Sequence, residues 1–307
     1  MNSASQALTR RRADFQVSAD TFRRVALVVT GMLIVIVATG ATVRLTSSGL
    51  GCRHWPGCQG TQFLPAKGYH SYVEFSNRIV AFFTVLGTLG LAMCAVFTRT
   101  LPRSAKVLAW GVFAGTLAQA PLGAITVYYD LNPWLVLSHL LLSLAVLGVA
   151  VLVVLEATWA LRGAAPPLPR PARAGGALLL ASVTVLLVAG TIVTASGPHP
   201  GGQDVQRLGS FQPALDWHVR ATAVFGLVFL GLAVWGWRNR ASFPWLPRAT
   251  AILLGLLGLQ MAVGEIQYRT RLPWWLVLIH VTVAACVFAW TVGLVARLWR
   301  PVARDSA

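Results

Sequence analysis

The stretch Trp275-Leu276-Val277-Leu278-Ile279-His280 decides the fold, because it occurs a second time as Trp134-Leu135-Val136-Leu137-Ser138-His139, 141 positions earlier. Five of the six positions are identical. The same offset pairs further identical residues: Gln119 with Gln260, Gly123 with Gly264, Ile125 with Ile266, and Gly90-Leu91-Ala92 with Gly231-Leu232-Ala233. A repeat of this length indicates two copies of one structural unit in a single chain.

Composition places this unit in a membrane. Of the 307 residues, 56% are hydrophobic and only 11% are charged, which is too apolar for an ordinary soluble domain. Eight runs reach the roughly 20 residues that a helix needs to cross a bilayer. They lie at about 25–43, 72–97, 107–128, 133–155, 176–196, 215–237, 249–267 and 274–297. We therefore predict an all-α polytopic membrane protein with eight transmembrane helices.

The repeat predicts how these helices are grouped. Spans one to four would form one four-helix bundle and spans five to eight a second, in tandem. Because an even number of crossings separates the copies, a pseudo-twofold axis would run along the membrane normal. We predict an N-terminal segment at 1–24, a first half at 25–160, a Pro/Arg-rich linker at 161–174, a second half at 175–298 and a tail at 299–307.

The distribution of positive charge predicts the orientation. Eight crossings put both termini on one side, where 17 of the 25 Lys and Arg residues lie, against 6 on the opposite side. The positive-inside rule then places both termini in the cytoplasm of a cell-membrane protein. The net charge of +16 is spread between apolar runs, which argues for membrane lipid and against nucleic acid as a partner. The first apolar run is too long for a signal peptide, so we expect it to be retained as an anchor.

Two histidines are candidates for iron ligands. His218 and His280 each lie about five residues into a span entered from the outer face, so they lie at similar depth. Two imidazoles at equal depth in a helical bundle are the usual axial pair of a b-type heme. A hydrogen bond between the helices is the alternative. The offset of 141 places Asn77 opposite His218 and His139 opposite His280, so the first half carries an Asn/His set. No CxxCH motif is present, so any heme would be held non-covalently.

A carboxylate lies beside this Asn/His set. Glu74 precedes Asn77 by three residues and therefore projects from the same helix face, where it could accept a proton. A salt bridge to Arg78, one turn away, is the alternative for Glu74. Arg78 and Arg220 could pair with heme propionates, unless they pair with Glu74 and Asp216 instead. The sequence leaves open the roles of Glu265 and His199.

The four cysteines fall into two classes. Cys52 and Cys58 lie in a long outer loop, on the oxidising side of the membrane, so we expect a disulfide. A redox-active thiol pair is the alternative. Cys94 and Cys286 lie within apolar spans and are expected to be packing residues.

The most specific motifs in the chain lie at the end of the first span and in the outer loop. They are Gly40-Ala41-Thr42-Val43-Arg44-Leu45-Thr46, then Ser48-Gly49-Leu50-Gly51-Cys52 and Trp55-Pro56-Gly57-Cys58-Gln59-Gly60. With Glu74-Phe75-Ser76-Asn77-Arg78, Ser196-Gly197-Pro198-His199 and the three span histidines, they make the sequence resemble the heme A synthase family over nearly its whole length.

The resemblance implies an oxidoreductase that converts the C8 methyl of heme O to the formyl group of heme A by successive hydroxylations, for use by terminal oxidases. His218 and His280 would then ligate a cofactor heme b, His139 the iron of the substrate heme O, and Glu74 would be the catalytic carboxylate. The resemblance further implies heme O synthase and terminal oxidase assembly factors as partners, with the heme sites toward the extracytoplasmic side. The resemblance also places Asn77 with His139 at the substrate heme. The chain departs from the family there, because histidine is common at this position and asparagine is a poor iron ligand.

Two other function classes remain as alternatives. A b-type cytochrome that only relays electrons would use two saturated bis-histidine sites, whereas this chain has one full pair and one incomplete pair. A transporter is supported only by the internal repeat.

Overall fold

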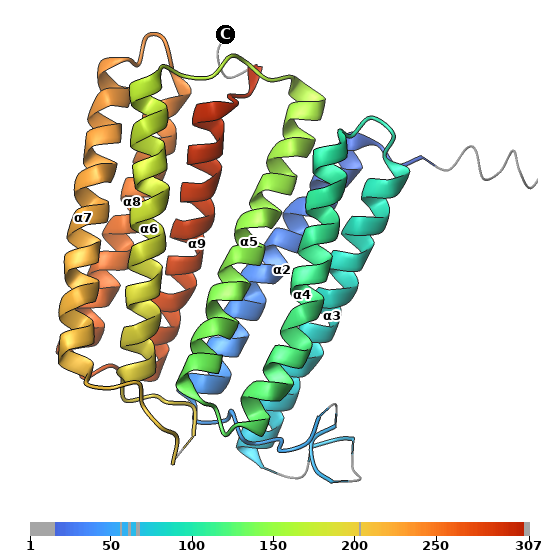
Figure 1. Ribbon diagram of the computed structural model, residues 1–307, viewed down its shortest axis with the longest axis vertical. Helices are drawn as coiled ribbons and strands as arrows, with labels where there is room; N and C mark the ends of the chain where they lie inside the picture. Colours follow the sequence, from blue (N-terminus) through green and yellow to red (C-terminus); the bar gives the residue numbers. More distant parts are fainter. Residues whose placement is uncertain (1–15, 56, 61–62, 66–67, 203, 304–307) are drawn as a thin grey trace, which may run out of the picture.

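The computed structural model describes residues 16–303, except 56, 61–62, 66–67 and 203. Within these residues the chain forms helices and no β-strand (Figure 1). The helices are α2 (Ala19–Leu45), α3 (Tyr69–Phe97), α4 (Arg103–Tyr128), α5 (Pro133–Arg162), α6 (Arg170–Ser196), α7 (Phe211–Arg238), α8 (Trp245–Arg269) and α9 (Trp274–Trp299). The basic run Arg10-Arg11-Arg12 and the end of the predicted tail lie outside the described residues.

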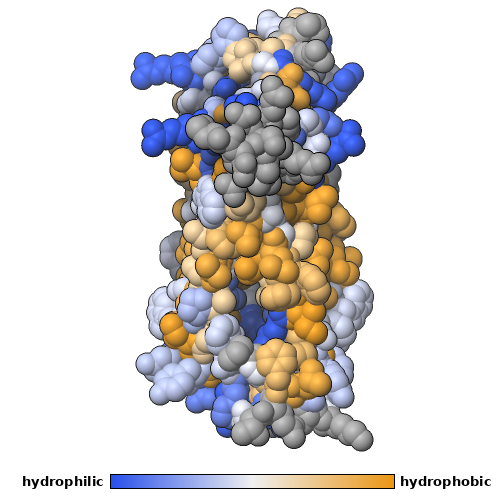
Figure 2. All heavy atoms as spheres, turned by 90° about the vertical axis from the view of Figure 1, so that its right-hand side faces the viewer, coloured by the Kyte–Doolittle hydropathy of each residue, from blue (hydrophilic) through white to orange (hydrophobic). Residues whose placement is uncertain are grey.

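The prediction of a multi-pass membrane protein is confirmed. All eight helices are long and apolar enough to cross a membrane. Large apolar side chains lie on the outside of the bundle, such as Phe82 and Leu227, which are 59% and 71% exposed. On the face that Figure 2 shows, an apolar band lies between two more hydrophilic ends. Only a lipid environment makes such exposure favourable along the length of a bundle.

The helices extend beyond the predicted spans, because their ends carry polar and basic residues that reach the membrane surface. Ser18 caps α2 by accepting a hydrogen bond from the Thr21 amide. In the same way, Asn132 caps α5 by accepting one from the Trp134 amide. The segment predicted as a linker at 161–174 is helical at both ends, since α5 continues to Arg162 and α6 begins at Arg170. Proline is tolerated in the first turn of a helix, so the Pro-rich sequence starts α6 rather than preventing it.

Two apolar cores lie within the described residues, one built mainly from α2 to α5 and the other mainly from α6 to α9. The arrangement as two tandem four-helix bundles stays a prediction. In Figure 1, α6 to α9 lie on the left and α2 to α5 on the right. One core includes Phe22 and Leu147, and the other includes Phe225 and Leu253. Helix α9 contacts α2, α5 and α6, so it lies at the junction between the two sets. The pseudo-twofold axis stays a prediction.

The two turns that precede the repeated WLVL stretches have the same backbone conformation. Asp130 and Leu131 adopt positive φ angles of 48° and 59°, and Arg271 and Leu272 adopt 64° and 59°. The Leu131 amide donates to the Thr126 carbonyl at 2.8 Å, and the Leu272 amide donates to the Gln267 carbonyl at 2.7 Å. Left-handed conformations are costly for leucine, so their repetition is a specific structural match. The repeat therefore continues into the turns and starts α5 and α9 in the same way.

The two halves are joined at both ends of the bundle. At the end that carries the long α2–α3 loop, Arg44 of α2 donates a hydrogen bond to the Thr194 carbonyl in the last turn of α6. Beside it, the Gly49 amide donates to the Gly201 carbonyl at 3.0 Å. At the opposite end, Arg300 forms a 3.2 Å ion pair with the buried Glu156 of α5. The last carbonyls of a helix lack partners within the helix, so Arg44 also caps α6.

We expect Arg44→Met to weaken the contact between the halves. The substitution keeps an unbranched side chain but removes the hydrogen bond to the Thr194 carbonyl, so the free energy of unfolding should fall by about 1–3 kcal/mol. Chemical denaturation in detergent micelles measures this change. The control is Arg24→Met on the same helix, whose ion pair with Asp20 is exposed. Equal losses in the two variants would contradict the role of Arg44.

Candidate functional site

The structure brings His218 and His280 together. They come from α7 and α9, and their ring centres lie 6.4 Å apart with the ring planes at 70°. Two imidazoles bonded to one metal from opposite sides, through bonds of about 2 Å, have ring centres roughly 6 Å apart. The separation therefore suits one iron between the two rings.

Each of these rings lies against a glycine on a neighbouring helix. A Cβ on Gly190 of α6 would come within 3.1 Å of His218 Cε1, and a Cβ on Gly264 of α8 within 3.1 Å of His280 Cε1. Any larger residue would push the ring away from its position. All four helices of the second half thus define the pair: α7 and α9 supply the imidazoles, and α6 and α8 supply the surfaces that support them.

The first half has the same construction with one substitution. His139 of α5 lies against Gly123 of α4, where a Cβ would be 3.6 Å from His139 Cε1. Gln119, one turn before Gly123, donates hydrogen bonds to the His139 carbonyl at 3.4 Å and to Ser143 Oγ at 2.8 Å. Asn77 of α3 is half-buried and accepts a 2.8 Å hydrogen bond from Thr39 of α2. This half therefore has one imidazole where the second has two.

Both sites fit a heme. The Nδ1 atoms of His139, His218 and His280 are buried, and the Leu186 and Gln260 carbonyls interact with the His218 and His280 rings. A carbonyl that accepts a hydrogen bond from one ring nitrogen leaves the other nitrogen of that ring available to a metal. Within the described residues, no cluster of three or more His, Cys, Asp and Glu is placed to hold a metal ion. Imidazole pairs around a prosthetic iron fit this donor set better than a metal held by protein ligands alone.

The structure gives Glu74 the salt-bridge partner that the sequence offers as an alternative. Its Oε1 accepts from Arg78 Nη2 at 2.6 Å, and its Oε2 accepts from the Cys52 amide at 2.7 Å. The carboxylate is only 5% exposed. A structural role and a catalytic one are compatible here, because a carboxylate has further lone pairs that these two bonds leave free.

Arg78 holds the outer loop rather than pointing freely toward a ligand. It donates to the carbonyls of His54 at 2.7 Å, Gly57 at 2.5 Å and Cys52 at 3.0 Å, in addition to Glu74. Four of its five N–H groups are therefore used, so a contact with a heme propionate would require some of these bonds to exchange. The loop that Arg78 holds contains the Cys52–Cys58 disulfide, which confirms the predicted pairing. Pro56 lies outside the described residues.

The other polar residues singled out in the sequence lie in separate surroundings. Arg220 stacks over the Trp217 ring at 5.2 Å, and Asp216 accepts from Gln212, so no Arg220–Asp216 pair forms. Glu265 forms an exposed ion pair with Arg269. His199 Nε2 hydrogen-bonds the Leu272 carbonyl at 2.8 Å, in the turn before α9. Cys94 and Cys286 are free thiols within α3 and α9.

Several residues that contact the candidate ligands were not assigned a role from the sequence. Gly123 and Gly264 stood in the repeat, together with Gln119 and Gln260, but nothing in a sequence says that a glycine supports a ring on another helix. Nothing in the sequence singled out Gly190 or Thr39. Gly190 on α6 and Thr39 on α2 can be recognised as parts of the sites only when the packing of the helices is known.

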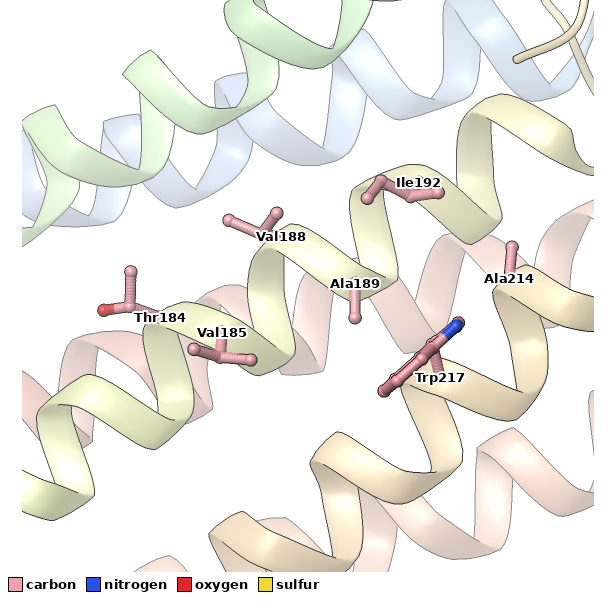
Figure 3. A pocket seen from close by; sticks show the side chains of 7 residues that line it. All are labelled: Thr184, Val185, Val188, Ala189, Ile192, Ala214 and Trp217. Atoms are coloured by element: carbon pink, nitrogen blue, oxygen red, sulfur yellow. The ribbon is translucent and has the colours of Figure 1, made fainter. Parts of the chain in front are cut away.

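A separate cavity lies between α6 and α7, with a volume of about 350 Å³ (Figure 3). Val188, Ile192 and Trp217 are among the side chains that line it, and only Thr184 in the lining is polar. None of the candidate ligands or carboxylates is part of it. Its chemistry suits lipid chains, and it is not the site described above.

Comparison with known proteins places the chain in a family. The model of the COX15-CtaA family, described as "Cytochrome oxidase assembly protein", matches residues 23–70 and 66–199, more than half of the chain. Similar proteins named "Heme A synthase" include those of Bacillus pumilus (33% identical over 141 residues), Symbiobacterium thermophilum (36% over 108) and Methylorubrum populi (32% over 171).

These similarities cover only part of each protein. The aligned segments span 44%, 34% and 50% of this chain, and 46%, 34% and 44% of the respective relatives. The chain thus matches less than half of the length of these relatives.

We expect Gly264→Ala to reduce heme binding in the second half. The added Cβ would meet the His280 ring at 3.1 Å, and overpacking of this kind costs about 1–3 kcal/mol, or roughly a 5- to 150-fold loss of heme affinity. The measurement is heme bound per protein across a titration. Gly258→Ala on the same helix is the control, because no atom lies within 4 Å of its added Cβ. Identical affinities for the two variants would show that Gly264 does not support the ring.

Proposed function

This chain belongs to the cytochrome oxidase assembly protein family, and from that premise we propose that it is a heme A synthase. The reaction would oxidise the C8 methyl group of heme O to the formyl group of heme A by successive hydroxylations. The observation that carries the proposal is the inequality of the two halves, since His218 and His280 lie together with their ring centres 6.4 Å apart while the first half offers His139 alone. A catalyst needs one site with an open position, whereas an electron relay would use two saturated sites.

We assign the two sites to different hemes. The second half would hold a resident heme b between His218 and His280, which supplies electron transfer when bound. The first half would hold heme O through His139, with Gly123 behind the ring and the Gln119 hydrogen bond fixing the backbone of α5. Thr39 and Asn77 would complete that pocket from α2 and α3.

Glu74 is the proton acceptor in this proposal. With water as the oxygen source, each hydroxylation of the methyl group releases two protons and two electrons. Glu74, which precedes Asn77 by one helical turn, would accept one of the protons, and the electrons would pass to an external acceptor. Arg78 and the Cys52 amide hold its two oxygens in fixed positions. The disulfide loop closes over this carboxylate through the four bonds of Arg78, so the loop would limit the access of water to the reacting group.

The orientation in the membrane is part of the proposal. The described chain starts and ends at one end of the bundle, as Figure 1 shows, and the contrast of 17 to 6 basic residues favours that end as cytoplasmic. The disulfide loop then lies on the oxidising side, at the end of the bundle where the histidine-bearing helices α5, α7 and α9 begin. Heme O would arrive from the synthase that produces it, and heme A would leave for a terminal oxidase under assembly.

If His218 and His280 are the axial ligands of the b-type heme, removing either one should remove the spectroscopic signal of that heme. Replacing His218 or His280 by Ala should remove the low-spin bis-imidazole signal of the b-type heme, because each ring supplies one axial bond. Electron paramagnetic resonance of the purified protein measures it. His54→Ala is the control, since this exposed loop histidine faces solvent. A normal signal in either span variant would reject the assignment.

The proposed role of Glu74 predicts a loss of turnover without a loss of binding. Glu74→Gln keeps the size and one accepting oxygen, so it retains one of the two hydrogen bonds from Arg78 and the Cys52 amide, but it is a far weaker base. Heme A formed per bound heme b should fall by about 100-fold or more, while heme O still binds. Glu265→Gln is the matched control, because Glu265 also has an arginine four residues later but is exposed.

The salt-bridge alternative predicts a different pattern for Glu74→Gln. The folding yield and the heme content would fall because a buried ion pair is disturbed, and the turnover per bound heme would be preserved. Near-normal turnover in Glu74→Gln would therefore remove the carboxylate from the catalytic role.

A further inference from the structure

The first half has Asn77 at the position where the second half has the imidazole of His218. This difference defines a site for a small ligand in the first half. His218 and Asn77 occupy equivalent places in the repeat, as do His280 and His139. We propose that a heme in the first half is five-coordinate through His139, and that Asn77 presents an N–H donor to a small ligand bound on the opposite face of the iron. This inference rests on the proposed function only in requiring a heme in the first half.

The chemistry of Asn77 makes it unsuitable as an iron ligand. A carboxamide binds metals through its neutral oxygen, a donor that suits Mg²⁺ and Ca²⁺, whereas imidazole nitrogen suits iron. In this structure the Asn77 oxygen is already used, because Oδ1 accepts the 2.8 Å hydrogen bond from Thr39 Oγ1. The oxygen is thereby turned toward α2 and away from an axial bond.

The same hydrogen bond orients the rest of the amide. With Oδ1 bound to Thr39, the Nδ2 group of Asn77 projects in the other direction and has no hydrogen-bond partner among the described residues. Glu74, one turn away, is held by Cys52 and Arg78 and does not compete for it. Thr39 therefore acts as an anchor that leaves two N–H donors available to a ligand.

The surroundings allow a small molecule to reach this half. Asn77 is half-buried rather than closed off, unlike the neighbouring Glu74. Figure 2, which views the α2–α5 side of the molecule, shows a hollow in the apolar band with hydrophilic atoms inside it. A donor on the distal face of a five-coordinate heme is a known means of controlling whether and how a small ligand binds. The ligand class is a diatomic or small anion that both binds iron and accepts a hydrogen bond.

Cyanide is the probe, added to the purified, oxidised protein with both hemes bound. One of the two hemes should change its absorption spectrum, and the bis-histidine heme should not. Asn77→His should abolish this response, because the new imidazole fills the free position and converts the site to the low-spin form. Asn77→Leu should still bind cyanide but release it about 2- to 10-fold faster, which is the effect of losing one hydrogen bond.

Two further variants test the geometry. Thr39→Val should accelerate cyanide release in the same direction as Asn77→Leu, because the amide loses its anchor. The reciprocal change, His218→Asn, should make the second-half heme responsive to cyanide, since it recreates there the single-imidazole site.

The outcomes separate this inference from the proposed function. Two bound hemes that are both low-spin and unresponsive to cyanide would overturn the five-coordinate site while leaving the heme assignments in place. A cyanide response that Asn77→His does not change would also overturn it. If the first half binds no heme under any condition, both the inference and the proposed function fail.

Discussion

Imidazoles buried within membrane-spanning helices are the constraint on which the rest of this structure depends. Three histidines have a buried Nδ1 in these helices, and the Leu186 and Gln260 carbonyls interact with the rings of His218 and His280. Ionisable side chains are costly in this environment, so their presence supports the proposed heme sites. The glycines behind the rings follow from the same constraint, because a ring can be held at a fixed position only if a neighbouring helix comes close enough to support it.

The inequality between the halves follows from a single position. The repeat reproduces the turn before α5 and α9, including two consecutive residues with positive φ, so His139 and His280 enter their helices in the same way. The difference is Asn77 in place of a second imidazole. In the proposed assignment, a duplicated cofactor site would become one saturated site and one open site, with the disulfide loop and Glu74 present only beside the open one.

The sequence predicted what depends on local pattern, and it missed what depends on packing. Apolar runs of the right length predicted all eight spans, and the offset of 141 predicted which residues correspond. The disulfide was predictable because Cys52 and Cys58 are close in sequence. The bond of Arg44 to the Thr194 carbonyl was not, because it joins residues 150 positions apart. Three of the four acceptors of Arg78 were equally hidden, because they are backbone carbonyls, which carry no residue-specific signal. The fourth, Glu74, was offered by the spacing of four residues.

The central claim is that the two halves have different functions. The second half would hold heme b permanently, and the first half would bind heme O and convert it to heme A. The most direct test is chromatography of the hemes extracted from wild-type protein and from His139→Ala, both produced with a supply of heme O. The wild type should yield unmodified heme b together with heme A, and His139→Ala should keep heme b and yield no heme A. Continued formation of heme A by His139→Ala would contradict this division of the two sites. Loss of heme b from His139→Ala would also contradict it, because the substitution alters only the first half.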